Sequence, residues 1–159
     1  MIRSSTSNDF DFLFELYMHP EINPWLSYEM MPAEAFRPIM EELLLKKAIY
    51  IYEQEGMAVG MFKLVPMKYR NSHIMYLGGV AIHPDHAGKG YAKEMILDAI
   101  DLVKSLDFTR IELTVAANNQ KAISLYEKCG FKKEGILKNY TFLPTENRYI
   151  DEQVMAYIG

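Results

Sequence analysis

The residues from His83 to Lys93, HPDHAGKGYAK, are the part of this chain best suited by type and spacing to hold a phosphate group. An apolar run typical of a strand, Ile74 to Ile82, precedes them, and a helical pattern, Tyr91 to Lys104, follows. Glycines let the backbone come close to a ligand, and the N–H groups and dipole at a helix start attract an anion. The pattern therefore predicts an anion site on the backbone of this turn. A tight strand–helix connection without a ligand is the alternative interpretation.

Composition limits the partners of such a site. The chain has 159 residues, half of them hydrophobic, a net charge of −4 and a sequence pI of about 5.6. One compact α/β domain spanning residues 1–159 is expected, with neither nucleic acid nor a membrane as partner. Four scattered histidines and a single cysteine give no metal-ligand spacing, so no metal is expected. The lone cysteine and the absence of an apolar leader in MIRSSTSND favour a cytoplasmic protein.

The surrounding elements follow from hydrophobic periodicity, turn residues and caps. Strands are predicted at 2–4, 48–52, 57–65, 74–82, 110–116, 132–140 and 149–158. Helices are predicted at 32–47, 91–104 and 119–129, the first of these with a kink or break at Pro38. An earlier helix is predicted from an N-cap at Ser7 or Asn8 to His19-Pro20. This order predicts a mixed, mostly antiparallel sheet of about seven strands with helices on both faces.

The two strands that flank the helix 91–104 should be parallel neighbours, because a helical crossover joins them. Gly78-Gly79 lies inside the first of these strands. Paired glycines in a strand interior indicate a bulge or a close approach by another backbone or a ligand. The sheet is therefore expected to be irregular at this point.

A second motif lies after the strand 110–116: Asn119-x-x-Ala122-x-x-x-Tyr126-x-x-x-Gly130-Phe131. Together with Ile82-x-Pro84 and the GKGYA turn, it resembles the GNAT family of acetyl-CoA-dependent N-acetyltransferases. The element order is similar over the whole chain, and the segments RIELTV, GFKKEG and Tyr149-Ile150-Asp151 look most like the branch that acetylates free amino acids and other small amines.

The resemblance implies a sheet splayed at a central bulge, with the pantetheine arm of acetyl-CoA between two strands. The implied contacts are backbone groups of Val80, Ala81 and Ile82 for pantetheine, those of Gly88, Lys89, Gly90, Tyr91, Ala92 and Lys93 for the pyrophosphate, and Asn119 near the pantetheine or adenine end. Asn119 is equally suited to be a plain N-cap. The family turn usually opens with Gln or Arg, and here that position is Ala87, so a side-chain contact is missing while the backbone cradle stays.

The same resemblance places Tyr126 near the cofactor sulfur, where a phenol with a pKa of about 10 can protonate the departing thiolate. A core tyrosine with a satisfied hydroxyl is the alternative. For the base, strand alternation puts Glu112 and Thr114 on one face, and Glu112 is the first candidate although some relatives place their carboxylate at the position of Thr114. His83, His73, Asp151 and a water relay remain open as alternatives.

The predicted reaction is direct attack of a small primary amine on acetyl-CoA in a ternary complex. Aromatic residues near Trp25 and in the loop 140–149 should line the acceptor pocket, which favours an apolar amine such as a hydrophobic amino acid over a polyamine. Such residues suit a homodimer interface equally well. A protein N-terminal or lysine acetyltransferase, and a CoA-binding module without activity, are the alternative functions.

Overall fold

The computed structural model describes residues 1–159. The strands are β1 (Ile2–Ser4), β2 (Ile49–Gln54), β3 (Met57–Pro66), β4 (Ile74–Ile82), β5 (Arg110–Ala116), β6 (Lys132–Leu143) and β7 (Arg148–Ile158). The helices are α1 (Phe10–Met18), α2 (Ala33–Leu45), α3 (Tyr91–Ser105) and α4 (Gln120–Lys128), with four short 3₁₀ turns, η1 to η4, between elements. All seven predicted strands and all four predicted helices are present, so the α/β class is confirmed.

The strand order is β1-β2-β3-β4-β5-β7-β6. The pairs β1–β2, β2–β3, β5–β7 and β6–β7 are antiparallel. The pair β4–β5 is parallel through Ile74↔Arg110, Met75↔Ile111 and Tyr76↔Glu112, as the intervening helix predicts. Beyond these pairs the two strands belong to different compact units, so the predicted splay of the sheet stays a prediction.

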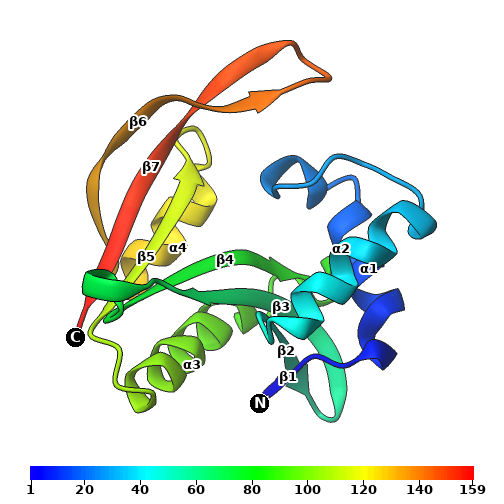
Figure 1. Ribbon diagram of the computed structural model, residues 1–159, viewed down its shortest axis with the longest axis horizontal. Coiled ribbons are helices and arrows are strands. Elements are labelled where there is room, and N and C mark those ends of the chain that lie inside the picture. Colours follow the sequence, from blue (N-terminus) through cyan, green and yellow to red (C-terminus); the bar gives the residue numbers. More distant parts are fainter. The chain divides into compact units, whose positions relative to one another are not determined.

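The chain forms two compact units, unit 1 (Met1–Val65 and Leu77–Ala99) and unit 2 (Pro66–Tyr76 and Ile100–Gly159). In unit 1, α1 and α2 pack on the sheet face that carries Ile51, Met61 and Ala81 (Figure 1). The other face lies against α3, because a Cβ at Gly60 would meet Ile82 Cδ1 at 2.6 Å and Met95 Sδ at 3.1 Å. Helices therefore cover both faces of this unit, as predicted.

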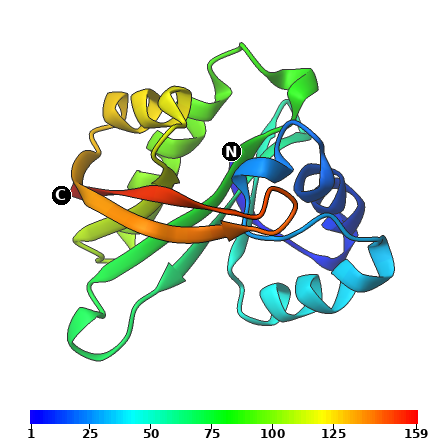
Figure 2. The ribbon, with the colours of Figure 1, turned by 90° about the horizontal axis from the view of Figure 1, so that it is seen from above.

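Unit 2 is built on the antiparallel strands β5, β7 and β6, with α4 following β5 directly. Figure 2 shows β6 and β7 as a long, twisted hairpin in orange and red. The predicted loop 141–148 is shorter in the structure, because β6 continues to Leu143 after a register shift between Leu137 and Thr141. At this shift Asn139 has φ +50°, and its N–H donates to Asp151 Oδ1 at 2.9 Å. The side-chain acceptor replaces a ladder bond, so the strand continues past the bulge.

The first two helices differ from the prediction in the cap of the first and in the unbroken course of the second. The capped element is the short turn η1 (Ser7–Asp9), which leads into α1. Its N-cap is Thr6, whose hydroxyl accepts from Asn8 N–H at 3.3 Å while Asp9 Oδ2 accepts from Thr6 N–H at 2.7 Å; Asp9, the N-cap of α1 itself, makes no side-chain capping hydrogen bond. This reciprocal capping box begins one residue earlier than the expected cap at Ser7 or Asn8. The helix α2 continues through Pro38, so the predicted break is absent while a kink there stays a prediction, and the helix buries Phe36 and Met40 on either side of that residue.

Asp9 joins the helix start to the first strands. Arg3 donates to it with two hydrogen bonds of 2.8 and 2.9 Å and also binds Glu53 through Nε at 2.6 Å. The hydrogen bond from Arg3 is the main reason that the pKa of Asp9 lies below its usual range. A carboxyl group with a depressed pKa contributes stability above its unfolded pKa of about 3.9, and this contribution is lost as the pH falls through the folded value.

We therefore expect Asp9→Asn to lower the free energy of unfolding at pH 7 by about 1–3 kcal/mol, since it weakens the hydrogen bonds between the buried side chain at position 9 and the partly exposed Arg3 guanidinium. The difference from the unsubstituted chain should shrink below about pH 4. Urea unfolding at pH 7 and pH 3 measures both effects. The control is Asp11→Asn, which changes an exposed carboxylate in the next turn and should have a much smaller effect.

Candidate functional site

The glycine turn before α3 has the geometry that an anion cradle requires. Gly88 and Gly90 have φ values of +79° and +81°, in the left-handed region that glycine adopts without strain. A Cβ built on either residue would meet no atom within 4 Å. The backbone of the turn therefore faces open space on the side where a side chain would project.

The helix α3 begins directly after this turn. Its first hydrogen bond runs from Glu94 N–H to the Gly90 carbonyl at 3.2 Å, so the N–H groups of Tyr91 and Ala92 have no acceptor inside the helix. These donors and the helix dipole favour a negative group at the turn. Lys89 and Lys93 belong to the same segment, which gives it two cations and no carboxylate between Gly88 and Lys93. The turn is therefore suited to hold an anion, and binding of a nucleotide diphosphate there stays a prediction.

His83, at the start of the segment that leads into the turn, uses both ring nitrogens in hydrogen bonds. Its Nδ1 accepts from Asp85 N–H at 3.1 Å, and its Nε2 lies 2.7 Å from Glu15 Oε1. Because Nδ1 is an acceptor, the ring proton is on Nε2 and is donated to Glu15. Both nitrogens are occupied, so His83 is poorly placed to remove a proton from an amine.

The glycine pair in β4 is irregular, as predicted. Gly79 has φ +57°, and a Cβ there would lie 3.1 Å from the Tyr17 hydroxyl oxygen. The residues proposed for pantetheine, Val80, Ala81 and Ile82, follow directly on the same strand. Their place next to an irregular strand segment is compatible with backbone pairing to a ligand, and that pairing stays a prediction.

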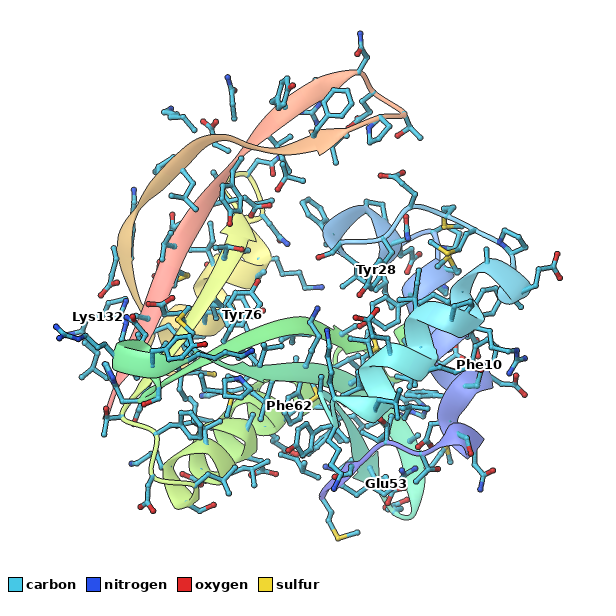
Figure 3. The ribbon with its side chains drawn as sticks, viewed as in Figure 1. Phe10, Tyr28, Glu53, Phe62, Tyr76 and Lys132 are labelled. Atoms are coloured by element: carbon cyan, nitrogen blue, oxygen red, sulfur yellow. The ribbon has the colours of Figure 1, made fainter.

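Tyr126 lies on the buried side of α4 in unit 2. It is 9% exposed, and its ring meets Phe131 edge-on with centroids 5.7 Å apart. Burial raises the pKa of its hydroxyl, and Tyr76 and Cys129 raise it further. Tyr76, labelled in Figure 3, in turn lies with its hydroxyl 3.5 Å from Thr114 Oγ1 on β5. The phenol therefore keeps its proton at neutral pH and belongs to a group of hydroxyls within unit 2.

Glu112, the first candidate for the base, forms an ion pair. Its Oε1 accepts from Arg110 Nε at 2.9 Å, and the same guanidinium binds Glu134 on β6 through both of its terminal nitrogens. These two carboxylates raise the pKa of Arg110, with Glu134 the larger cause. The arginine therefore occupies one of the two carboxylate oxygens of Glu112 and leaves that side chain less accessible to an amine.

A second carboxylate, Glu152, was missed by the sequence reasoning. It lies opposite Ala116 of β5 and Leu137 of β6, on the face that also carries Glu112 and Thr114. Burial raises the pKa of Glu152, against a smaller lowering effect of the hydrogen bond from Thr141 Oγ1 at 3.0 Å. Alternation within YIDEQVMAYI could have placed it on this face, but its burial depends on both neighbouring strands.

The remaining sequence candidates have structural partners. Asn119 is the N-cap of α4 and accepts from Ala122 N–H at 3.2 Å, so that interpretation is confirmed. Asp151 accepts from Asn139 N–H at 2.9 Å and from Lys138 Nζ at 3.1 Å, which lowers its pKa and makes it a poor base. His73 is exposed, and its carbonyl accepts from the N–H groups of Thr109 and Arg110.

The loop 140–149 was expected to line the acceptor pocket with aromatic side chains, but the cavity next to it in unit 2 has a largely polar lining. A cavity of about 390 Å³ is lined by Ala117, Asn118, Asn139, Arg148, Tyr149, Ile150 and Asp151. Tyr149 is 59% exposed and packs on Phe142 with ring centroids 5.0 Å apart. In unit 1, Trp25 is 52% exposed. These rings are available to contact an apolar group.

Comparison with known proteins identifies the class. The pattern of the Acetyltransferase (GNAT) family matches residues 10–131. The chain therefore belongs to the GNAT family of acetyltransferases, and it is an enzyme of the N-acetyltransferase type. The predicted family is confirmed.

Individual relatives are similar over nearly the whole chain. The spermidine N(1)-acetyltransferase of Vibrio cholerae is 30% identical over 97% of this chain and 90% of its own length. The L-amino acid N-acetyltransferase AaaT of Escherichia coli is 26% identical over 99% of this chain and 97% of its own length. The crystal structure of the Vibrio cholerae spermidine N-acetyltransferase in complex with CoA and spermine superposes with a TM-score of 0.86, at 25% identity, over 99% of this chain and 94% of that chain.

No group of three or more His, Cys, Asp or Glu side chains is arranged to hold a metal ion. None of the helices has the length and apolarity needed to cross a bilayer.

Proposed function

We propose that the protein transfers the acetyl group of acetyl-CoA to the primary amine of a small molecule by direct attack in a ternary complex. The observation that carries the proposal is the turn at Gly88 and Gly90, whose left-handed backbone faces open space immediately before α3. In this proposal the turn binds the pyrophosphate, and the backbone of Val80 to Ile82 binds the pantetheine arm. Membership in the acetyltransferase family and similarity to enzymes named for small amines support the proposal.

The chemistry needs one base and one acid. The neutral amine attacks the thioester carbonyl carbon, and the nitrogen passes a proton to the base as the C–N bond forms. The C–S bond then breaks, and the sulfur receives the electron pair and a proton from the Tyr126 hydroxyl. The base-bound proton returns to solvent, and the phenolate regains a proton from water. The products are the acetylated amine and CoA with a free thiol.

The elevated pKa of Tyr126 affects how it acts. A thiol has a pKa of about 8.5, below that of a buried phenol, so complete proton transfer to a free thiolate is unfavourable. The hydroxyl therefore acts first by donating a hydrogen bond that stabilises the negative charge developing on the sulfur, and transfer of the proton is completed as water reprotonates the phenolate. The phenol also remains protonated at the pH at which the amine is reactive.

Glu112 and Glu152 are the two carboxylates proposed for the base, and Glu152 is favoured because no arginine is bound to it. A carboxylate with a raised pKa is better matched to accept a proton near neutral pH. The alternative of a water relay predicts that neither side chain is essential.

We expect Glu152→Gln to lower kcat at pH 7 by about tenfold or more, in the range typical of a general base. Glu112→Gln is the matched control on the same face and should retain most of the activity. The raised pKa means that kcat/KM should increase with pH through the Glu152 titration, and the Gln variant should lose this acidic limb. A large loss in Glu112→Gln with full activity in Glu152→Gln would reverse the assignment.

Two alternatives differ from this proposal in substrate or activity. An N-terminal or lysine acetyltransferase would prefer a peptide, and an inactive CoA-binding module would release no thiol. The second alternative is favoured by Ala87, which stands where the family usually has Gln or Arg. The test is release of free CoA thiol from acetyl-CoA in the presence of amino acids, amines and peptides. Peptide preference or the absence of release for every acceptor would contradict the proposal.

A further inference from the structure

Lys63 is a half-buried lysine without a charged partner. It lies on β3, opposite Ile49 of β2, and shares the sheet face of Met61 that α1 and α2 cover. Its ammonium group forms neither a hydrogen bond nor an ion pair in the structure. Burial lowers the pKa of Lys63, and the positive charge of Lys46 lowers it further. Lysines are seldom withdrawn from water in this way unless an anion compensates the charge.

A second polar group without a partner lies beside the same strand segment. Tyr17 on α1 is 2% exposed, and its ring is held by Phe36 at 5.3 Å and by Tyr28 at 5.5 Å between centroids. Figure 3 labels Tyr28 in this aromatic cluster. The Tyr17 hydroxyl has no hydrogen-bond partner in the chain, but its oxygen still reaches solvent, since no fully buried side-chain oxygen is unsatisfied.

Gly79 brings the two groups together. A Cβ at this position would lie 3.1 Å from the Tyr17 hydroxyl oxygen and 3.6 Å from Lys63 Cβ. A side chain at Gly79 would therefore crowd the Tyr17 hydroxyl, and the bare backbone of this glycine lets the phenol and the base of the Lys63 side chain lie near one another. Both groups can donate hydrogen bonds, and the packed aromatic rings fix the phenol before any ligand arrives.

The surrounding charges leave this place positive. Lys46 is paired with Glu42 at 2.9 Å, and Glu42 also contributes, after burial, to the raised pKa of Tyr28. The Lys46–Glu42 pair has no net charge, so neither of its members compensates the positive charge of Lys63. An anion is attracted to such a site, whereas a polycation is repelled.

We propose that Lys63 and the Tyr17 hydroxyl bind the carboxylate of the acceptor, so that the acceptor is an α-amino acid and not a polyamine. This inference rests on the proposed acetyl transfer to a small amine. It separates the two relatives described above, one named for spermidine and one for L-amino acids. The exposed rings near Trp25 are suited to an apolar side chain on that amino acid.

The test compares four acceptors that differ in the carboxylate: L-phenylalanine, L-phenylalaninamide, phenethylamine and spermidine. With thiol release as the assay, kcat/KM for phenylalanine should exceed that for each of the others by tenfold or more. The comparison with the amide is stringent, because the amide loses its ammonium proton more easily and so offers more neutral amine at pH 7. Equal values for phenylalanine and its amide, or a preference for spermidine, would overturn the inference.

Three variants locate the carboxylate site. Lys63→Met keeps the aliphatic stem, and it should lower kcat/KM for phenylalanine by tenfold or more while that for the amide changes by less than twofold. Tyr17→Phe should give a smaller loss of the same kind. Lys68→Met removes an exposed charge and is the control. If Arg148→Met no longer prefers phenylalanine over its amide while Lys63→Met keeps that preference, the carboxylate binds in the unit 2 cavity and the assignment to Lys63 is refuted.

Failure of this inference is distinguishable from failure of the proposed function. If kcat/KM for phenethylamine and for spermidine equals or exceeds that for phenylalanine, the proposed acetyl transfer stands and the inference of an amino-acid acceptor is wrong. If no acceptor is acetylated, calorimetric titration of the CoA-saturated protein with phenylalanine and with its amide still tests recognition of the carboxylate. Preferential binding of phenylalanine that is lost in Lys63→Met would support the site, and equal binding would refute it.

Discussion

Phenylalanine in place of Tyr126 is expected to lower kcat by tenfold or more while CoA binds with unchanged affinity. A tenfold loss corresponds to about 1.4 kcal/mol of activation free energy. The substitution removes only the hydroxyl, and the ring contact with Phe131 remains. Because burial raises the pKa of this hydroxyl, it should remain protonated to at least about pH 9, so no alkaline decline of kcat is expected from it in that range.

Steady-state kinetics and calorimetry with CoA measure the two parts of this prediction. Tyr157→Phe is a matched control, since Tyr157 contacts the same Phe131 ring from β7 at 5.9 Å between centroids. The control should retain full turnover. If Tyr126→Phe also turns over at the original rate, the hydroxyl is a packing group and the acid must be sought elsewhere or supplied by water.

Valine in place of Gly90 is expected to weaken CoA binding by a hundredfold or more. The side chain would project into the open space beside the turn, where the proposed pyrophosphate lies, and would also force valine to adopt φ +81°. The steric effect should act on the cofactor, whereas the backbone strain should act on stability.

Gly56→Val separates these two effects. Gly56, in the turn between β2 and β3, has φ +76°, and a Cβ added there would likewise meet no atom within 4 Å, but this residue has no proposed contact with CoA. The two variants should lose comparable stability in thermal unfolding, and only Gly90→Val should lose CoA binding by calorimetry. Unchanged CoA affinity in Gly90→Val would rule out the turn as the diphosphate site.

Local sequence determined the elements and the turn that the proposed mechanism uses. The bounds of β4 and β5 were predicted to the residue, and α3 begins at Tyr91 as its pattern indicated. Hydrophobic periodicity, a glycine with positive φ and a capping side chain act over a few residues, so they can be read from a short stretch of sequence. The family motifs lie in these same stretches, which is why the enzyme class was accessible before the fold.

Tertiary structure decided which charged groups are available for chemistry. Alternation correctly placed Glu112 and Thr114 on one face of β5. Only the pairing of distant strands showed that Arg110 joins Glu112 to Glu134, and that Glu152 is partly buried without a cation. Likewise, Lys63 is an ordinary strand lysine in the sequence. It becomes an unpaired cation beside Tyr17 only after α1, β3 and β4 pack together, because desolvation and the distance between charges depend on contacts between segments remote in the chain.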